Sequence, residues 1–231
     1  MSHAESKKRG AIIGVVNLKG GVGKTTIAQT IAMYFLEHTD RKNVLIVDAD
    51  PQGSSVKWAE IAVEKNLPAP RIQGLTAAPK LMIQELLALR EERDLVVVDC
   101  PARLGESTRA AMAAADLLLM PVTPGPAEVW AVQDTLKLLQ VALVARPELV
   151  TRAVMNRDSK TGIAADVAAA LEMAGVVVMD QKIKQSVQYP DAMAVGKTVL
   201  SYKPSEKAAF EARKFGAEVK RLLDGIVGGG A

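Results

Sequence analysis

One segment, Lys19-Gly-Gly-Val-Gly-Lys-Thr-Thr26, constrains the fold and chemistry of this 231-residue chain more than any other. It follows a short apolar run and opens a stretch with helical periodicity. Its glycines let the backbone turn tightly, with positive φ where needed, so that successive N–H groups point at phosphate oxygens. The helix that follows adds the positive end of its dipole. The segment therefore predicts a phosphate-binding loop between a buried strand and a helix.

Two side chains of this loop have expected chemical tasks. Lys24 supplies a point charge for the β- and γ-phosphates, and the hydroxyl of Thr25 is the expected Mg²⁺ ligand. The generic pattern requires glycine where this chain has Leu18, and a second lysine, Lys19, precedes the glycines. The residues expected to surround the phosphates of a bound nucleotide are Gly20, Gly21, Val22, Gly23, Lys24, Thr25 and Thr26.

Continuous apolar runs alternate with longer helical stretches along the chain. Such runs indicate strands buried on both faces, as in parallel sheets. The alternation predicts an α/β fold, a doubly wound and mainly parallel β-sheet flanked by helices. We expect a flexible lead-in over 1–10, a single domain over 11–224 and a flexible tail over 225–231. The expected strands are 11–16, 44–47, 95–98, 117–120, 151–154 and 176–179, and the expected helices are 25–38, 54–65, 79–92, 107–115, 127–145 and 163–173.

Two of these strands end in acidic residues. The run 44–47 delivers Asp48 and Asp50 to the carboxyl end of the sheet, where ligands bind in such folds. The alternative for Asp50-Pro51 is a turn that caps the next helix. Leu95-Val-Val-Val-Asp99 has the shape of a Walker B strand, which would place Asp99 beside the loop to hold a water on Mg²⁺.

The position of the second lysine carries a family resemblance. Lys19-Gly-Gly-Val-Gly-Lys-Thr-Thr26 resembles the deviant Walker A box of the ParA/MinD superfamily. The resemblance implies that Lys19 reaches across a dimer interface to the phosphates of the partner's ATP, so that hydrolysis weakens the dimer. The segment 48–53 is similar to the second box of that family. By that resemblance Asp50 orients the attacking water and Asp48 supports the metal shell, so the implied catalytic residues are Lys19, Lys24, Asp48 and Asp50, and the implied metal residues are Thr25, Asp48 and Asp99.

Later landmarks extend the resemblance over residues 11 to about 223. The proline-rich segment 119–126 is similar to that of small plasmid ParA proteins, and the chain resembles this short type. Asn156 resembles the residue that contacts adenine, with a turn asparagine as the alternative. Pro204 lies in a segment that resembles the loop bordering adenine. Cys100 is expected to be a packed thiol, because a single cysteine cannot supply a cluster or an internal disulfide.

The C-terminal stretch is basic. Residues 181–231 hold nine Lys or Arg against five acids, whereas the whole chain has a net charge of only +3. We expect a helix from a Ser205 cap to Asp224, ended by Gly225. On it, Lys207 and Lys214 precede acids by four residues, which predicts a ladder of ion pairs. The alternative is a patch facing duplex DNA, formed by Lys182, Lys184, Lys203, Arg213 and Lys220.

The resemblance implies a slow, Mg²⁺-dependent ATPase that forms a homodimer with ATP and binds nucleoid DNA without sequence preference. A ParB-like or adaptor partner would stimulate it, and the cargo would be a plasmid or similar body. One cysteine and the lack of a long apolar run favour the cytoplasm. One alternative is a MinD-like membrane ATPase, but 224–231 is too short and glycine-rich for an amphipathic anchor. The other is a metabolic ATP-dependent enzyme, which would need a dedicated substrate pocket.

Overall fold

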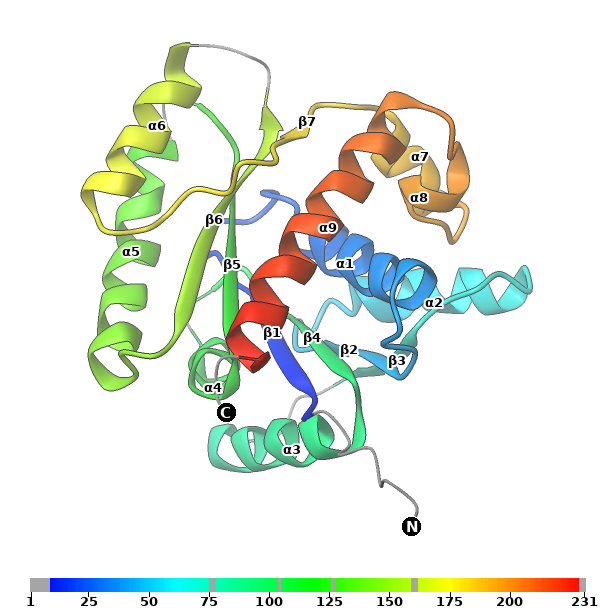
Figure 1. Ribbon diagram of the computed structural model, residues 1–231, viewed down its shortest axis with the longest axis horizontal. Helices are drawn as coiled ribbons and strands as arrows, with labels where there is room; N and C mark the ends of the chain where they lie inside the picture. Colours follow the sequence, from blue (N-terminus) through cyan, green and yellow to red (C-terminus); the bar gives the residue numbers. More distant parts are fainter. Residues whose placement is uncertain (1–8, 75–77, 104, 126–127, 159–161, 229–231) are drawn as a thin grey trace.

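The computed structural model describes residues 9–74, 78–103, 105–125, 128–158 and 162–228. Its centre is a seven-stranded sheet with the strand order β3-β2-β4-β1-β5-β6-β7, and every described neighbour pair is parallel. The predicted doubly wound, parallel α/β fold is therefore confirmed (Figure 1). The strands are β1 (Ala11–Val15), β2 (Val44–Asp48), β3 (Arg71–Gly74), β4 (Leu95–Asp99), β5 (Leu117–Val122), β6 (Val150–Asp158) and β7 (Ile183–Lys184).

Helices cover both faces of the sheet. Alternate residues of the central strand pack to opposite sides: Ile12 belongs to one buried apolar cluster, and Ile13 belongs to the other. The first cluster takes residues from α3 to α6, and the second takes residues from α1, α2 and α7 to α9 (Figure 1). The helices are α1 (Lys24–His38), α2 (Ser54–Glu64), α3 (Pro79–Glu92), α4 (Glu106–Ala114), α5 (Glu128–Ala145), α6 (Gly162–Met173), α7 (Gln188–Ala194), α8 (Val199–Tyr202) and α9 (Lys207–Gly228).

The strand register brings the sequence boxes to one edge of the sheet. Asp99 at the end of β4 is paired with Val15 on one side and with Asp48 on the other. The loop after β1 and both acidic strand ends therefore lie together at the carboxyl edge, as the parallel arrangement requires.

Several predicted boundaries were wrong. The run 176–179 makes only an isolated bridge, between Ala153 and Val178, and β7 follows it instead. Ser205 does not cap α9, which begins at Lys207, and Gly225 does not end it, because the helix continues to Gly228. Residues 225–228 thus belong to a helix. Of the predicted flexible lead-in, residues 9 and 10 are described, and Arg9 pairs with Asp116. Residues 1–8 and 229–231 lie outside the described residues. Within the described ranges, no helix combines the length and apolarity that a membrane span requires.

Candidate functional site

The loop between β1 and α1 has the conformation that its glycines predict. Gly21 has φ +76° and Gly23 has φ +91°, both in the left-handed region that side chains rarely adopt. Asn17, which sequence reasoning missed, fixes the start of the loop. Its amide donates to the carbonyl of Pro121 at 2.7 Å, and its side-chain oxygen accepts the N–H of Lys19 at 2.8 Å. The loop is therefore anchored to the end of β5 as well as to β1.

Gly23 also touches a residue that is remote in sequence. The side-chain amide of Asn156, from β6, donates to the carbonyl of Val22 at 2.7 Å. A Cβ on residue 23 would lie 2.2 Å from the Nδ2 atom of Asn156. Asn156 therefore holds the loop, and a Cβ at residue 23 would require the Asn156 side chain to move.

Lys24 lies inside the loop. Its side chain is buried, and Nζ donates to the carbonyl of Lys19 at 3.0 Å. Burial lowers the pKa of Lys24, while the nearby Asp99, Cys100 and Asp50 act in the opposite direction. A buried ammonium beside backbone N–H groups is suited to an anionic ligand.

Asp99 is buried at the end of β4, where two hydroxyls meet it. The hydroxyl of Ser55, at the start of α2, donates to Oδ2 of Asp99 at 2.9 Å, and the side chain of Thr25 also hydrogen-bonds to this carboxyl group. Burial is the largest cause that raises the pKa of Asp99 to about 7, and the charge of Asp48 adds to it. The sequence predicted Thr25 and Asp99 as residues of one metal site, but it did not indicate Ser55. The position of Ser55 beside Asp99 depends on how α2 packs against the sheet.

The carboxylate of Asp48 accepts hydrogen bonds from the backbone of the residues that follow it. Its Oδ1 accepts the N–H of Asp50 at 3.1 Å, and its Oδ2 accepts those of Ser55 at 2.9 Å and Val56 at 3.2 Å. The last two are N–H groups of the first turn of α2, so Asp48 serves as the helix cap. Burial raises the pKa of Asp48, and these three N–H donors counteract the effect. Asp48 therefore holds the second box against the sheet.

Asp50 is half-buried and forms the predicted turn. Its Oδ1 accepts the N–H of Gln52 at 3.0 Å, and its carbonyl accepts the N–H of Gly53 at 2.9 Å. Its charge also acts on Lys24, so the two groups are near each other. The turn interpretation is therefore compatible with a position of Asp50 near the phosphate loop.

A cavity of about 360 Å³ adjoins the loop. Thr26 and Asn156 lie among its lining residues. Pro204 is exposed and does not line this cavity; its carbonyl accepts a hydrogen bond from Arg213 at 2.8 Å. The structure therefore brings Asn156 to the site but not Pro204, and Pro190 of α7 lies at the cavity instead. The remaining lining residues are Gly23, Arg157, Lys184, Gln185, Ser186, Val187, Tyr189 and Met193.

The ion-pair ladder expected on α9 is not formed by the described residues. Glu211 pairs with Lys184 of β7 at 2.9 Å, and Glu218 is buried and accepts the backbone N–H groups of Asp180 and Gln181. The acids face the protein because the helix packs against the β7 segment. Lys207, Lys214 and Arg221 are left exposed, seven residues apart in a column along α9.

The five residues predicted to contact DNA differ from one another in their partners and exposure. Lys184 is paired with Glu211, Lys220 with Asp224, and Arg213 donates to the carbonyl of Pro204. Lys203 lies over the ring of Tyr202, and Lys182 is exposed. The structure therefore spreads these five residues among separate local contacts. Cys100 is a free, buried thiol whose pKa is raised by burial, as expected for a packed cysteine.

Comparison with known proteins agrees with this geometry. Residues 13–201 match the model of the CobQ/CobB/MinD/ParA nucleotide binding domain. The chromosome-partitioning ATPase Soj of Thermus thermophilus is 31% identical over 239 residues, covering 90% of this chain and 94% of Soj. The chain belongs to the ParA/MinD superfamily. It is therefore related to partition and positioning ATPases, and the fold and loop are those of a nucleotide-binding ATPase.

Other members are similar over most of their length. The maintenance of carboxysome distribution protein A of Halothiobacillus neapolitanus is 29% identical over 218 residues, covering 93% of this chain and 95% of that protein. A plasmid partition protein of Borrelia burgdorferi, solved with AMPPNP, has a TM-score of 0.72 at 17% identity and covers 93% of this chain. MinD of Pyrococcus horikoshii, solved with Mg-ADP, has a TM-score of 0.71 at 20% identity and covers 92%. These two structures support the ParA/MinD fold.

Proposed function

We propose that this chain is a slow, Mg²⁺-dependent ATPase that dimerises around ATP, binds nucleoid DNA without sequence preference and positions a cargo in the cytoplasm. The positions of the two lysines of the phosphate loop are the main support for this proposal. Lys24 is buried inside it, and Lys19 lies at its half-exposed rim next to the exposed Gly20 and Gly21. A cation at the rim of a phosphate site is suited to reach a second subunit's nucleotide, whereas one inside serves its own.

The residues present fit ATP and Mg²⁺. A Cβ at residue 23 of the loop would meet the side chain of Asn156, and the buried ammonium group of Lys24 donates to the carbonyl of Lys19. Thr25 and Asp99 supply the oxygen donors that Mg²⁺ prefers, with phosphate oxygens and water as the usual remaining ligands. Bound Mg²⁺ would neutralise phosphate charge during transfer to water. Lys24 and Lys19 would bind the phosphates, and Asp50, whose charge acts on Lys24, would orient the water.

The Asp50→Ala variant tests the dimer. We expect it to accumulate as an ATP-bound dimer in size-exclusion chromatography, because binding is retained while hydrolysis no longer opens the interface. The wild type with ADP should be monomeric. As controls, Lys24→Ala should stay monomeric with ATP because it lacks the phosphate contact, and Lys19→Ala should bind ATP without dimerising. An Asp50→Ala protein that binds ATP and remains a monomer would contradict the sandwich dimer.

The column on α9 tests DNA binding. Replacing Lys207, Lys214 and Arg221 by Gln should weaken ATP-dependent binding to duplex DNA. Each lost phosphate contact should reduce the slope of log affinity against log salt by about 0.9. A gel shift or anisotropy titration at several salt concentrations measures this slope. The matched control is Lys182, Lys203 and Arg213 changed to Gln. An unchanged slope in the column variant, with a reduced slope in the control, would move the interface to the residues first predicted.

The cargo and partner follow from relatives rather than from this chain's geometry. The relatives are named for chromosome partitioning, plasmid partition and carboxysome distribution. We propose a plasmid or a comparable large body, bound through a ParB-like or adaptor protein. The membrane alternative is less favoured, because Ile226 and Val227, the last bulky apolar residues described, pack against the core instead of forming a separate anchor.

A further inference from the structure

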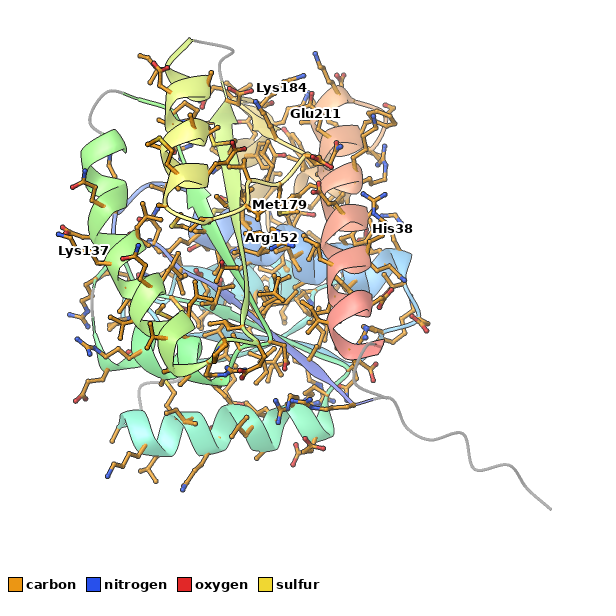
Figure 2. The ribbon with its side chains drawn as sticks, turned by 60° about the vertical axis from the view of Figure 1, so that its left-hand side comes forward. His38, Lys137, Arg152, Met179, Lys184 and Glu211 are labelled. Atoms are coloured by element: carbon orange, nitrogen blue, oxygen red, sulfur yellow. The ribbon has the colours of Figure 1, made fainter. Side chains whose placement is uncertain are left out.

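The segment 180–187, which leads into α7, is held by the C-terminal helix. Glu218 accepts the N–H of Asp180 at 2.9 Å and the N–H of Gln181 at 2.8 Å. Glu211, two turns earlier on α9, pairs with Lys184 at 2.9 Å, and Figure 2 shows these two side chains meeting between β7 and α9. The segment therefore runs antiparallel to α9 and is attached to it at two points.

The distance between the two attachments is about the same along α9 as along the extended segment. Seven residues of α-helix span about 10 Å, and three to four residues of extended chain span about 10–13 Å. Between the attachments, Ile183 is buried in the same apolar cluster as Phe215 of α9. The carboxylates thus fix the extended stretch 180–184 at both of its ends.

The attached segment leads directly into the wall of the cavity beside the phosphate loop. Lys184, Gln185, Ser186 and Val187 line that cavity, followed by Tyr189 of α7. Burial, with the charge of Glu211 as the second cause, raises the pKa of Tyr189, so Glu211 lies near Tyr189 as well as being paired with Lys184. Gly23 and Thr26 of the phosphate loop and Asn156 of β6 also line this cavity. The carboxylate of Glu211 on α9 therefore reaches the cavity lining through Lys184.

The burial of the Glu218 carboxylate has to be compensated by its contacts. Glu218 is 8% exposed, and its carboxylate accepts hydrogen bonds from two backbone N–H groups. Removing a carboxylate from water is unfavourable unless hydrogen bonds compensate for it, and here they are charge-assisted. In Glu218 each carboxylate oxygen accepts one of these two successive N–H groups. An amide of the same size would keep one of these oxygens and place an NH₂ group, which is a donor, opposite the other N–H.

We propose that Glu218 and Glu211 are positioning residues for the nucleotide base, which hold the 180–187 segment so that it closes the base side of the site. This rests on the proposed function, because it takes an adenine nucleotide as the occupant. The phosphate loop itself does not depend on either carboxylate. Loss of the attachment should therefore weaken binding of a ligand that carries a base and leave binding of the bare phosphates unchanged.

The test compares ADP with inorganic pyrophosphate, both with Mg²⁺, by calorimetry on the full chain. Glu218→Gln keeps the size of the side chain but replaces one acceptor by an NH₂ group that faces an N–H donor. We expect its affinity for ADP to fall about tenfold and its affinity for pyrophosphate to change by less than about twofold. Glu211→Gln leaves the Glu218 contacts intact and should lower ADP affinity about threefold, as for a partly exposed ion pair. The matched control is Glu172→Gln, an exposed glutamate of α6, which should behave as the wild type.

The outcomes separate this inference from the proposed function. Equal losses for ADP and pyrophosphate, or no loss for ADP, would overturn the positioning role. Should Glu218→Gln fail to fold, the ADP-selective loss in Glu211→Gln decides. A wild type that binds both ligands equally well would show that the cavity does not bind the base. This would overturn the positioning role and would still support the phosphate site. A wild type that binds neither would instead overturn the proposed ATPase.

Discussion

Replacing Gly23 by alanine should abolish nucleotide binding, lowering affinity by at least about 100-fold. The added Cβ would meet Nδ2 of Asn156 at 2.2 Å, and the residue already has φ +91°. The strain of a left-handed alanine and the collision act together, and relief requires Asn156 to release the carbonyl of Val22. Calorimetry with ADP and Mg²⁺ measures the loss, and circular dichroism checks that the fold remains.

Gly21→Ala is the matched control. Gly21 has φ +76°, but nothing lies within 4 Å of its added Cβ, so this variant carries the backbone strain without the collision. It should bind ADP with a loss of about tenfold. The double variant Gly23→Ala with Asn156→Ala removes the obstacle and should recover part of the affinity lost in Gly23→Ala. Equal losses in Gly21→Ala and Gly23→Ala would show that the contact with Asn156 plays no part.

Local patterns predicted the centre of the fold. The strands β1, β2, β4 and β5 are buried runs of Val, Ile and Leu, and each was expected within two residues of its observed ends. The helix Pro79–Glu92 has both predicted boundaries, because proline is favoured in a first turn and an apolar stripe marks its length. The phosphate loop was recognisable for the same reason, since its glycines have a local conformational task.

Elements that depend on remote contacts were missed. The edge strand β3, Arg71–Gly74, is polar and half-exposed, so it lacks the apolar signal of a central strand. Asn17 and Ser55 acquire their roles only when Pro121 and Asp99 are brought beside them. Spacing along the chain does not show those contacts.

The helix α9 shows how a correct pattern can lead to a wrong interaction. The i,i+4 spacing of Lys207 and Glu211 is compatible with an ion pair, yet Glu211 pairs with Lys184. A contact with a remote cation, partly shielded from water, is stronger than an exposed pair on the helix surface. Because the acids turn inward, the cations of the column remain exposed, which the sequence pattern alone did not indicate.

Asp99→Asn should stabilise the protein without nucleotide by about 3 kcal/mol at pH 8 while removing Mg²⁺-dependent ATP hydrolysis. Burial raises the pKa of Asp99 to about 7, so at pH 8 the native state holds an ionised carboxylate in an unfavourable place. Asparagine is similar in shape, is uncharged and retains an oxygen that can accept the hydroxyl of Ser55. The gain should nearly disappear at pH 5, where Asp99 is already protonated.

The pH dependence of stability distinguishes this account from a simple packing effect. Because the native pKa of Asp99 lies above the value of about 4 in the unfolded chain, the native state binds more protons between pH 4 and 7. The free energy of unfolding of the wild type should therefore fall as pH rises through this window and level off above it. Urea denaturation without nucleotide at pH 5, 6, 7 and 8 should show a smaller fall for Asp99→Asn, whereas Asp166→Asn, at an exposed site on α6, should follow the wild type. If Asp99→Asn and the wild type lose stability in parallel across these pH values, Asp99 is not the titrating group, and its carboxylate is ionised at little cost in the native state.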